Sequence, residues 1–398
     1  MTRPPPPTAS VLPGADSLPA AEAAPTFTRG LWRIAGAQVT SGNAVTLLDS
    51  EAAIDAMLQG VADATERIDL EMYIYHGDRI GRRMTDALVQ ALGRGVAVRV
   101  LVDWIGSRGA GAAQQFARLR DAGAQVRPFS PPGLRAWLGL LPRDHRKVLV
   151  IDGTVGFTGG VNIGDEWIVR APRRRAPWRD TAVRIAGPAA GDLLRAFESM
   201  WRRASGEPQT RADRRRERRL VRQPRNAALP HDAPPALVGI IEGEPGRYRI
   251  SRALQFQSVA AERSIWIASA YFVPGGAELE ALAGAARDGV DVRILVPSTT
   301  DHPWIRRFTR RRYRRLLENG VRIWEWRGEM MHAKTSVTDG RLVRVGSTDF
   351  NPLGLAINYE LDALVLDRDF GMAAEAVFLA DLAASKEITQ ASREVRDA

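Results

Sequence analysis

Hydrophobic and polar positions predict the same order of elements twice along the chain. Residues 67–76 (RIDLEMYIYH) have the β-branched and aromatic content of a strand, and residues 79–95 carry apolar side chains at helical spacing before a glycine. Residues 96–103 (VAVRVLVD) predict a second strand. The second half repeats these three elements at 264–272, 275–289 and 290–297. Strand, helix and strand in this order predict parallel pairing, and therefore an α/β layer in each half.

The match between the halves continues further along the chain. Each half goes on with a helix and a short strand, at 125–129 (QVRPF) and at 321–326 (VRIWEW). A hairpin-like segment follows, with an Asp-Gly turn at residues 152–153 in one half and 339–340 in the other. Two copies of one plan predict an internal pseudo-two-fold axis.

Composition shifts divide the chain into five parts. The first is Pro/Ala-rich, the third carries a dense arginine run and few large apolar residues, and the last is polar. The predicted parts are a disordered leader (1–28), a first domain (29–203), a basic linker (204–236), a second domain (237–386) and a polar tail (387–398).

The overall composition limits the class of protein. A chain of 398 residues with 45% hydrophobic residues is enough for two ordinary domains with buried cores. It contains no cysteine, which excludes disulfides, thiolate metal sites and thiol nucleophiles. The net charge of +10 predicts an anionic partner, either nucleic acid or an acidic membrane surface.

No run reaches the ~18 apolar residues of a spanning helix, and the N-terminus lacks the apolar segment of a signal peptide. We therefore expect a cytoplasmic protein that contacts membranes only peripherally, at the inner face of the cell membrane. The sequence does not predict an oligomeric state.

The chemistry concentrates in one duplicated motif. HRKVLVID (145–152) and HAKTSVTD (332–339) both read His-x-Lys, four residues, then Asp, and they occupy matching places in the two halves. Alternation along a strand puts His and Lys on one face, where they can converge on a phosphate. The chain has only three lysines and otherwise uses arginine, so Lys147 and Lys334 indicate a need for a compact ammonium.

This duplicated motif resembles that of the phospholipase D superfamily. Within it, TGGVNIGDEW, WRDTAVRIAGP, RDGVDVRILVPSTTDH and VGSTDFNP are most similar to bacterial cardiolipin synthases. The resemblance implies two tandem α/β/α sandwich domains related by a pseudo-two-fold, with the active site at their interface. This agrees with the α/β class predicted from the repeat.

The resemblance also implies a reaction through a phosphohistidine. One His attacks phosphorus while the other protonates the departing alcohol and then activates the acceptor. We favour His145 as nucleophile and His332 as acid/base, with the reverse left open, and expect Lys147 and Lys334 to hold the phosphate oxygens. No cofactor or metal is expected, because the sequence shows no carboxylate cluster suited to a metal.

Other residues support these four. The superfamily places an acid that orients the histidine about thirty residues downstream of each motif, where this chain has Asp180 and Glu360. The motif acids Asp152 and Asp339 are expected to be structural. Tyr73 and Tyr271 take equivalent strand positions, with core packing favoured and a place at the pocket left open.

Family members bind phosphate with a small polar residue and an Asn after the motif. The candidates for contacts with phosphate or substrate here are Asn162, Ser347 and Asn351. Two departures stand out: Gly160 lacks the hydroxyl, and Asp349 replaces the amide with an acid.

Two segments indicate an interfacial substrate. PFSPPGLRAWLGLLPRD (128–144) precedes the first motif, and PWIRRFTRRRYRRLL (303–317) predicts a basic amphipathic helix. The expected membrane contacts are Trp137, Leu138, Leu140, Leu141, Trp304 and Phe308. Packing of both segments inside the domain is equally open.

The leading hypothesis is a phosphatidyltransferase that joins two phosphatidylglycerols and releases glycerol. It implies a phospholipid substrate and an anionic membrane as partners, and it disfavours nucleic acid. A hydrolytic phospholipase D is the alternative, followed by a nuclease and by a lipid-binding scaffold without catalysis.

Overall fold

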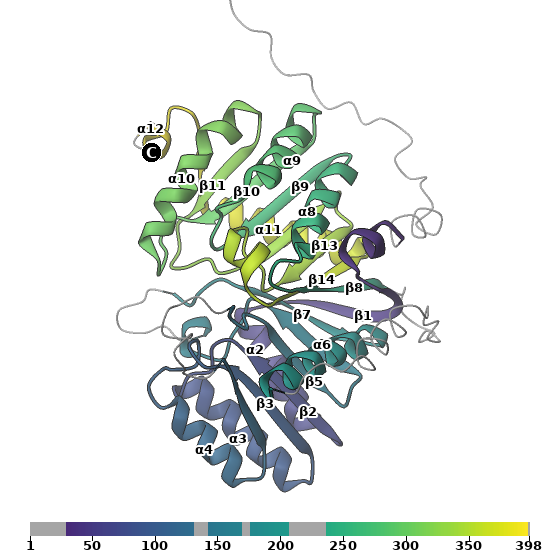
Figure 1. Cartoon of the computed structure of the whole chain (residues 1–398). Coiled ribbons are helices and arrows are strands. Elements are labelled where there is room, and N and C mark those ends of the chain that lie inside the picture. The colour runs from purple at the N-terminus through teal and green to yellow at the C-terminus, as the bar shows by residue number, and fades with distance from the viewer. Residues whose placement is uncertain (1–28, 131–141, 169–175, 207–235, 397–398) are drawn as a thin grey trace, which may run out of the picture.

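The chain folds around one continuous sheet whose two faces are covered by helices (Figure 1). The computed structural model describes residues 29–130, 142–168, 176–206 and 236–396. The sheet has 15 strands in the order β15-β11-β10-β9-β12-β13-β14-β8-β1-β7-β6-β5-β2-β3-β4.

The first half follows a helix over residues 29–35. Its elements are β1 (Val39–Asp49), α2 (Ser50–Asp63), β2 (Arg67–Met72), α3 (Arg79–Gly93), β3 (Ala97–Asp103), α4 (Ala112–Asp121), β4 (Gln125–Phe129), β5 (Lys147–Ile151), β6 (Val155–Gly159), η1 (Asp165–Trp167), β7 (Thr181–Ala186) and α6 (Pro188–Ala204).

The second half repeats this order and adds a C-terminal extension. Its elements are β8 (Ala236–Gly243), α8 (Arg249–Ala260), β9 (Ser264–Ser269), α9 (Gly276–Arg287), β10 (Asp291–Pro297), α10 (Pro303–Glu318), β11 (Arg322–Trp326), β12 (Lys334–Thr338), β13 (Leu342–Gly346), η2 (Leu353–Ile357), β14 (Glu360–Leu366), α11 (Arg368–Ala383), β15 (Ser385–Ile388) and α12 (Arg393–Arg396).

The strand order is symmetric about the pair formed by β8 and β1. Moving outward from this pair, β1 meets β7, β6, β5, β2, β3 and β4, while β8 meets β14, β13, β12, β9, β10 and β11. These two series are equivalent strand by strand. The predicted α/β class and the predicted pseudo-two-fold are therefore confirmed.

The predicted crossovers are present in both halves. Strands β2, β3 and β4 run parallel, with Leu70 opposite Val100 and Val100 opposite Val126. Strands β9, β10 and β11 are also parallel, with Ile294 between Ile267 and Ile323. A parallel pair needs a long connection, and α3, α4, α9 and α10 provide it.

The two Asp-Gly turns lock the motif hairpins in place. Asp152 and Asp339 both adopt positive φ, of 49° and 54°, as does the glycine that follows each, the pattern of a type I′ turn. The Asp152 carboxylate accepts backbone hydrogen bonds from residues 65–67, and that of Asp339 accepts equivalent bonds from residues 262–264. The acids thus tie the turn to the start of β2 or β9, a bracing role like the one expected.

Three large clusters of buried residues stabilise the fold. One joins α2, α3 and α4 to the first half of the sheet, and another joins α8, α9 and α10 to the second. The third runs through both halves and includes α6, α11 and the central strands. Helix α6 contacts β8 and helix α11 contacts β1, so two equivalent helices each pack on the first strand of the other half.

Two predicted domain boundaries are corrected by the structure. Residues 387–396 are no polar tail: Ile388 pairs with Ile323, and Ile388 and Val395 are buried because they cover the edge strand β11 and the end of α10. At the other end, Leu31 and Ala35 belong to the core of the second half, so residues 29–37 do not pack with the predicted first domain. Most of the predicted linker, residues 207–235, lies outside the described residues, as does the leader 1–28.

Candidate active site

The motif histidines stand at the start of two equivalent central strands. β5 begins at Lys147 and β12 begins at Lys334, with His145 and His332 two residues earlier. Both lysines are almost fully buried, and each Nζ donates to the carbonyl oxygen of its own motif histidine at 2.6 Å. Each motif therefore presents an imidazole and an ammonium together, as the sequence alternation predicted.

Each histidine is held by a carboxylate from the opposite half of the molecule. The Nδ1 atom of His145 lies 3.0 Å from both oxygens of Glu360, and Nδ1 of His332 lies 2.7 Å from Oδ2 of Asp180. In the sequence, each acid follows the motif of its own half. The structure exchanges the partners, so the site exists only where the two halves meet.

Backbone pairing at the centre of the sheet explains this exchange. The amide of His145 donates to the carbonyl of Tyr359 at 2.9 Å, and the amide of His332 donates to Arg179 at 2.7 Å. These contacts extend two short parallel bridges, Asp144–Tyr359 and Arg179–Met331. The residue after Tyr359 or Arg179 is the acid, so each bridge delivers a carboxylate to the histidine of the other half.

The two acids are supported by different donors. Ser347 Oγ donates to Glu360, whereas the indole Nε1 of Trp167 donates to Asp180 Oδ2 at 2.9 Å. Gly160 stands where Ser347 stands in the other half, and a Cβ at Gly160 would collide with the Asp180 carboxylate. The indole of Trp167 thus takes the place of the missing hydroxyl. The sequence did not single out Trp167, and the only sign of the change was the glycine at position 160.

The expected phosphate contacts are engaged within the protein. Asn162 accepts from the Ile74 amide at 3.0 Å and donates to the Gly160 carbonyl, and Asn351 bridges Tyr271 to Gly354. Ser347 both donates to Glu360 and accepts from Leu361. Direct phosphate binding by the three side chains stays a prediction, and the contacts in the structure are those within the protein.

Two tyrosines line the motif side chains in equivalent ways. Tyr73 lies edge-on to His145, with ring centroids 4.7 Å apart, and its ring lies 5.2 Å from Lys147 Nζ. Tyr271 has the same relation to His332, at 6.0 Å, and to Lys334, at 5.6 Å. Of the two alternatives that the sequence left open, the structure supports contact with the site.

Burial sets the protonation of the histidines. It lowers the pKa of His145 well below its usual value, and the charge of Lys147 acts in the same direction. Burial and Lys334 also lower the pKa of His332, while Asp180 opposes them. The charges of Lys334 and His332 contribute to the pKa of His145, so the two motifs lie within electrostatic reach of each other.

The two carboxylates respond to burial differently. Burial raises the pKa of Glu360 to about 8, although Lys147 opposes the shift. Burial also acts to raise the pKa of Asp180, but His332 and Lys334 outweigh it and the pKa is lowered. Near neutral pH the carboxylate charge is therefore held at Asp180 beside His332, and Glu360 is largely protonated.

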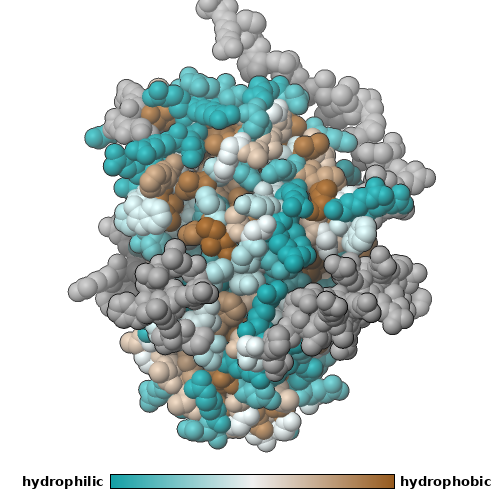
Figure 2. All heavy atoms as spheres, in the orientation of Figure 1, coloured by the Kyte–Doolittle hydropathy of each residue, from teal (hydrophilic) through white to brown (hydrophobic). Residues whose placement is uncertain are grey.

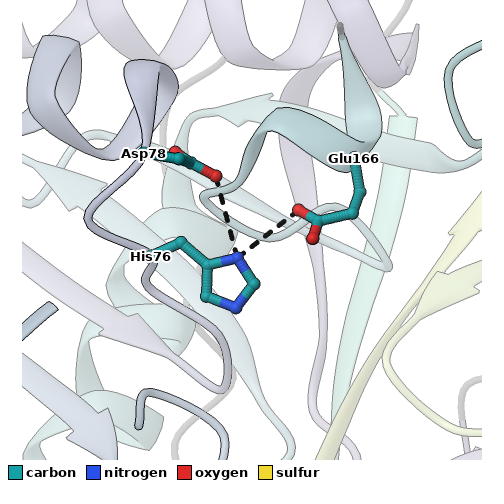
Figure 3. A group of neighbouring side chains, drawn as sticks. All are labelled: His76, Asp78 and Glu166. Carbon is teal, nitrogen blue, oxygen red and sulfur yellow. Dashed lines mark ion pairs between the residues drawn. The ribbon is translucent and has the colours of Figure 1, made fainter. Parts of the chain in front are cut away.

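A small cluster of titratable groups lies beside the site. His76 Nδ1 is 3.7 Å from Asp78 Oδ2 and 3.5 Å from Glu166 Oε2 (Figure 3). Asp78 already accepts from the amides of Gly81 and Asp165, and hydrogen bonds to Asp78 and then Glu166 raise the pKa of His76 to about 9. The three side chains form an ionic brace, in which the His76 imidazolium pairs with two carboxylates.

A series of neighbouring aromatic rings runs from the buried His332 to the exposed surface of α10. Ring centroids follow one another from His332 to Tyr271, then His302, Trp304 and Phe308, with separations of 6.0, 5.8, 6.4 and 6.1 Å. Trp304 is 60% exposed and Phe308 43% exposed, whereas Ile305 and Leu316 pack inward. The other predicted membrane contacts, Trp137, Leu138, Leu140 and Leu141, lie outside the described residues.

None of the helices in the described ranges is long and apolar enough to cross a bilayer. Over the region of α10, hydrophilic and hydrophobic residues lie side by side on the surface (Figure 2). This mixture is what an amphipathic surface helix presents.

Known proteins resemble this chain in both sequence and fold. Residues 57–201 and 258–382 match the family model described as cardiolipin synthase, PLD-like domain. The chain is 32% identical to cardiolipin synthase A of Pseudomonas syringae pv. syringae over 92% of its own length and 74% of that protein. It is also 32% identical to the major cardiolipin synthase of Bacillus subtilis, over 88% of this chain and 71% of the relative.

A solved structure shares the fold. The phosphatidylserine synthase of Haemophilus influenzae superposes with a TM-score of 0.65 at 15% identity, covering 91% of this chain and 92% of the other. The ranges that match the family model include both motifs, and they also include the pairs His145–Glu360 and His332–Asp180. The chain therefore belongs to the cardiolipin synthase family of phospholipase D-like enzymes.

Proposed function

We propose that this enzyme transfers a phosphatidyl group from one phosphatidylglycerol to a hydroxyl of another, releasing glycerol and forming cardiolipin. One observation carries the proposal. Each motif histidine has its Nδ1 held by a carboxylate of the other half, which leaves both Nε2 atoms available for chemistry at one phosphate. The names of the relatives supply the lipid class.

In the first step His145 is the nucleophile. Its Nε2 forms a bond to phosphorus as the bond from phosphorus to the glycerol oxygen breaks. His332 gives its proton to that oxygen, so glycerol leaves as a neutral alcohol. Lys147 and Lys334 stabilise the charge on the non-bridging oxygens, and no metal takes part in this scheme.

In the second step the roles are reversed at the same atoms. Nε2 of His332, now neutral, takes the proton from a hydroxyl of the second phosphatidylglycerol. The hydroxyl oxygen bonds to phosphorus as the bond to His145 Nε2 breaks, which restores both histidines.

The unequal carboxylates support this assignment of roles. A nucleophile must be neutral, and burial together with Lys147 keeps the pKa of His145 low beside a largely protonated Glu360. An acid must carry a proton, and although burial and Lys334 lower the pKa of His332, the ionised Asp180 opposes that shift and stabilises the imidazolium form. In the reverse assignment His145 would be the imidazolium, and it would lie beside Glu360, the acid that carries less negative charge.

We further propose that the enzyme works at the cytoplasmic face of the cell membrane through peripheral contact. Trp304 and Phe308 would enter the interface, and the arginines of α10 would bind anionic headgroups. Among them Arg307, Arg311 and Arg314 are exposed, with no ion pair to the described residues. Each basic group near an anionic bilayer contributes about 1 kcal/mol.

Purified protein incubated with phosphatidylglycerol vesicles tests the proposal. We expect cardiolipin and glycerol in equal amounts from the wild type, and loss of both with His145→Ala or His332→Ala. Phosphatidic acid with glycerol would instead indicate hydrolysis, because water then replaces the acceptor alcohol in the second step. Wild-type turnover by either variant would contradict the two-histidine mechanism.

A further inference from the structure

Asp349 is a buried carboxylate in the site that the proposed reaction does not use. It lies between β13 and η2 and is 4% exposed. Its Oδ1 atom accepts no hydrogen bond from the described residues, and Lys334 Nζ, at 3.5 Å, is its nearest cation. Oδ1 of this buried carboxylate therefore has an ion-pair partner but no hydrogen bond from the described residues, and it can still accept from a donor that the substrate brings.

Asn162, at the equivalent position in the first half, makes structural hydrogen bonds that Asp349 does not make. Asn162 closes two hydrogen bonds within the protein, to the Ile74 amide and the Gly160 carbonyl. A carboxylate can accept but cannot donate, so Asp349 cannot reproduce this pattern. Its charge instead acts on both motif histidines, on Lys147 and on Tyr271, which places it inside the reaction site.

The chemistry of a carboxylate restricts what Asp349 can bind. The non-bridging oxygens of a phosphodiester are acceptors and carry negative charge, so an ionised Asp349 repels them. An alcohol hydroxyl is a donor and suits the empty acceptor. Phosphatidylglycerol brings two free hydroxyls on its headgroup, next to the phosphate that Lys334 would hold.

We propose that Asp349 accepts a hydrogen bond from a free hydroxyl of the glycerol headgroup and thereby selects polyol headgroups over simple alcohols. The proposal rests on the proposed function, since it names the substrate group that the same site recognises. A hydrogen bond to a charged acceptor that is lost on mutation changes relative rates by about tenfold or more.

The test compares two lipids of equal charge that differ only in the headgroup alcohol. Release of glycerol and of ethanol is measured from vesicles that contain phosphatidylglycerol and phosphatidylethanol together, so that phosphatidylglycerol is the acceptor in both reactions, with wild type, Asp349→Asn and Asp301→Asn. Asp301 is a matched control, because its carboxylate is also near the site but already accepts from the Tyr271 hydroxyl at 2.7 Å. We expect the preference of kcat/KM for phosphatidylglycerol to fall about tenfold in Asp349→Asn only.

Three outcomes would overturn the inference. If Asp349→Asn changes both rates by the same factor, or neither, the carboxylate does not contact the headgroup. If Asp301→Asn shifts the preference equally, the effect is one of charge alone. If the wild type releases no headgroup from either lipid, the proposed function itself fails, a result distinct from an active wild type whose preference survives the mutation.

Discussion

The two motif histidines are alike in sequence but occupy unequal environments. Both have lowered pKa values, yet the acid beside His332 is ionised and the acid beside His145 is largely protonated, with a pKa of about 8. The pseudo-two-fold is thus broken at the residue scale, by Trp167 at Asp180 and Ser347 at Glu360. This asymmetry supports the roles that we propose for the two histidines.

Amide substitutions of the two acids should have unequal effects. Asp180→Asn removes a negative charge beside the imidazolium of His332, whereas Glu360→Gln resembles the protonated acid already present. We expect kcat to fall about 100-fold or more for Asp180→Asn and at least tenfold less for Glu360→Gln. Steady-state rates on phosphatidylglycerol at pH 7 check this. Equal losses would mean that the two carboxylates carry the same charge.

A substrate with a good leaving group should separate the nucleophile from the acid. A p-nitrophenyl phosphodiester loses p-nitrophenolate without needing a proton, so His332→Ala should still form the phosphohistidine. We expect a burst of about one p-nitrophenolate per active site from His332→Ala, followed by slow turnover, and no burst from His145→Ala. A burst from His145→Ala alone would reverse the assignment.

Sequence could predict the residues of the site but not their pairing. The duplicated His and Lys stand out because they recur at fixed spacing. The partner of each histidine depends on how two distant segments meet across β8 and β1, and no local spacing encodes that contact. The role of Trp167 could not be predicted for a similar reason. Its indole donates to Asp180 as the Ser347 hydroxyl donates to Glu360, but the two donors stand at different positions of the repeat.

At the scale of elements, an ionic brace holds η1 beside the start of α3. Asp78 caps α3 through the Gly81 amide and also accepts from the Asp165 amide, and His76 joins it to Glu166. Trp167 follows Glu166 directly, so the brace also positions the indole that supports Asp180.

The ionic brace should make the free energy of unfolding fall as the pH rises into the alkaline range. The pKa of His76 is raised to about 9 by Asp78 and Glu166, so its contribution is full below about 6.5 and is lost as pH rises through 9. We expect wild type to exceed His76→Gln in stability by about 1 kcal/mol at pH 6, after allowance for solvent screening. Thermal unfolding of both from pH 6 to 10 measures this. A gap that stays constant to pH 10 would show that His76 contributes by packing.

Periodicity predicted the long elements well and the short ones poorly. The range expected for the basic helix, 303–317, differs from α10 by one residue at its end, because seven arginines and four inward-facing side chains give a clear amphipathic pattern. β15 and α12 are each four residues long and bury single apolar side chains, Ile388 and Val395. So weak a pattern could not be told from a polar tail.

At the scale of the whole molecule, the continuous sheet makes one enzyme from two incomplete halves. Neither half holds both a motif histidine and the acid that orients it. The ion pair of Arg179 with Asp381, at 2.9 Å, and the crossed contacts of α6 and α11 fix the halves in register. Within the second half, the start of α10 lies near the site, because Asp301 accepts from the Tyr271 hydroxyl.

Membrane docking through α10 should therefore be separable from the chemistry. Replacing Trp304 and Phe308 together by Ala removes two large exposed apolar side chains, whose burial in a bilayer is worth roughly 1.5–3 kcal/mol each. We expect binding to phosphatidylglycerol vesicles to weaken at least tenfold, and turnover on vesicles to fall with it. Val259→Ala is the control, because Val259 is 82% exposed on α8, away from this surface.

A soluble p-nitrophenyl phosphodiester shows where the loss arises. If α10 only delivers the enzyme to lipid, the rate on this substrate should fall far less than the rate on vesicles, because the four motif side chains come from other strands. Raised salt should weaken vesicle binding of both wild type and the double variant, since the arginines act through screened charge. A double variant that bound vesicles as tightly as Val259→Ala would leave the helix without a membrane role, and its aromatic rings would then serve only to pack against the loop at His302.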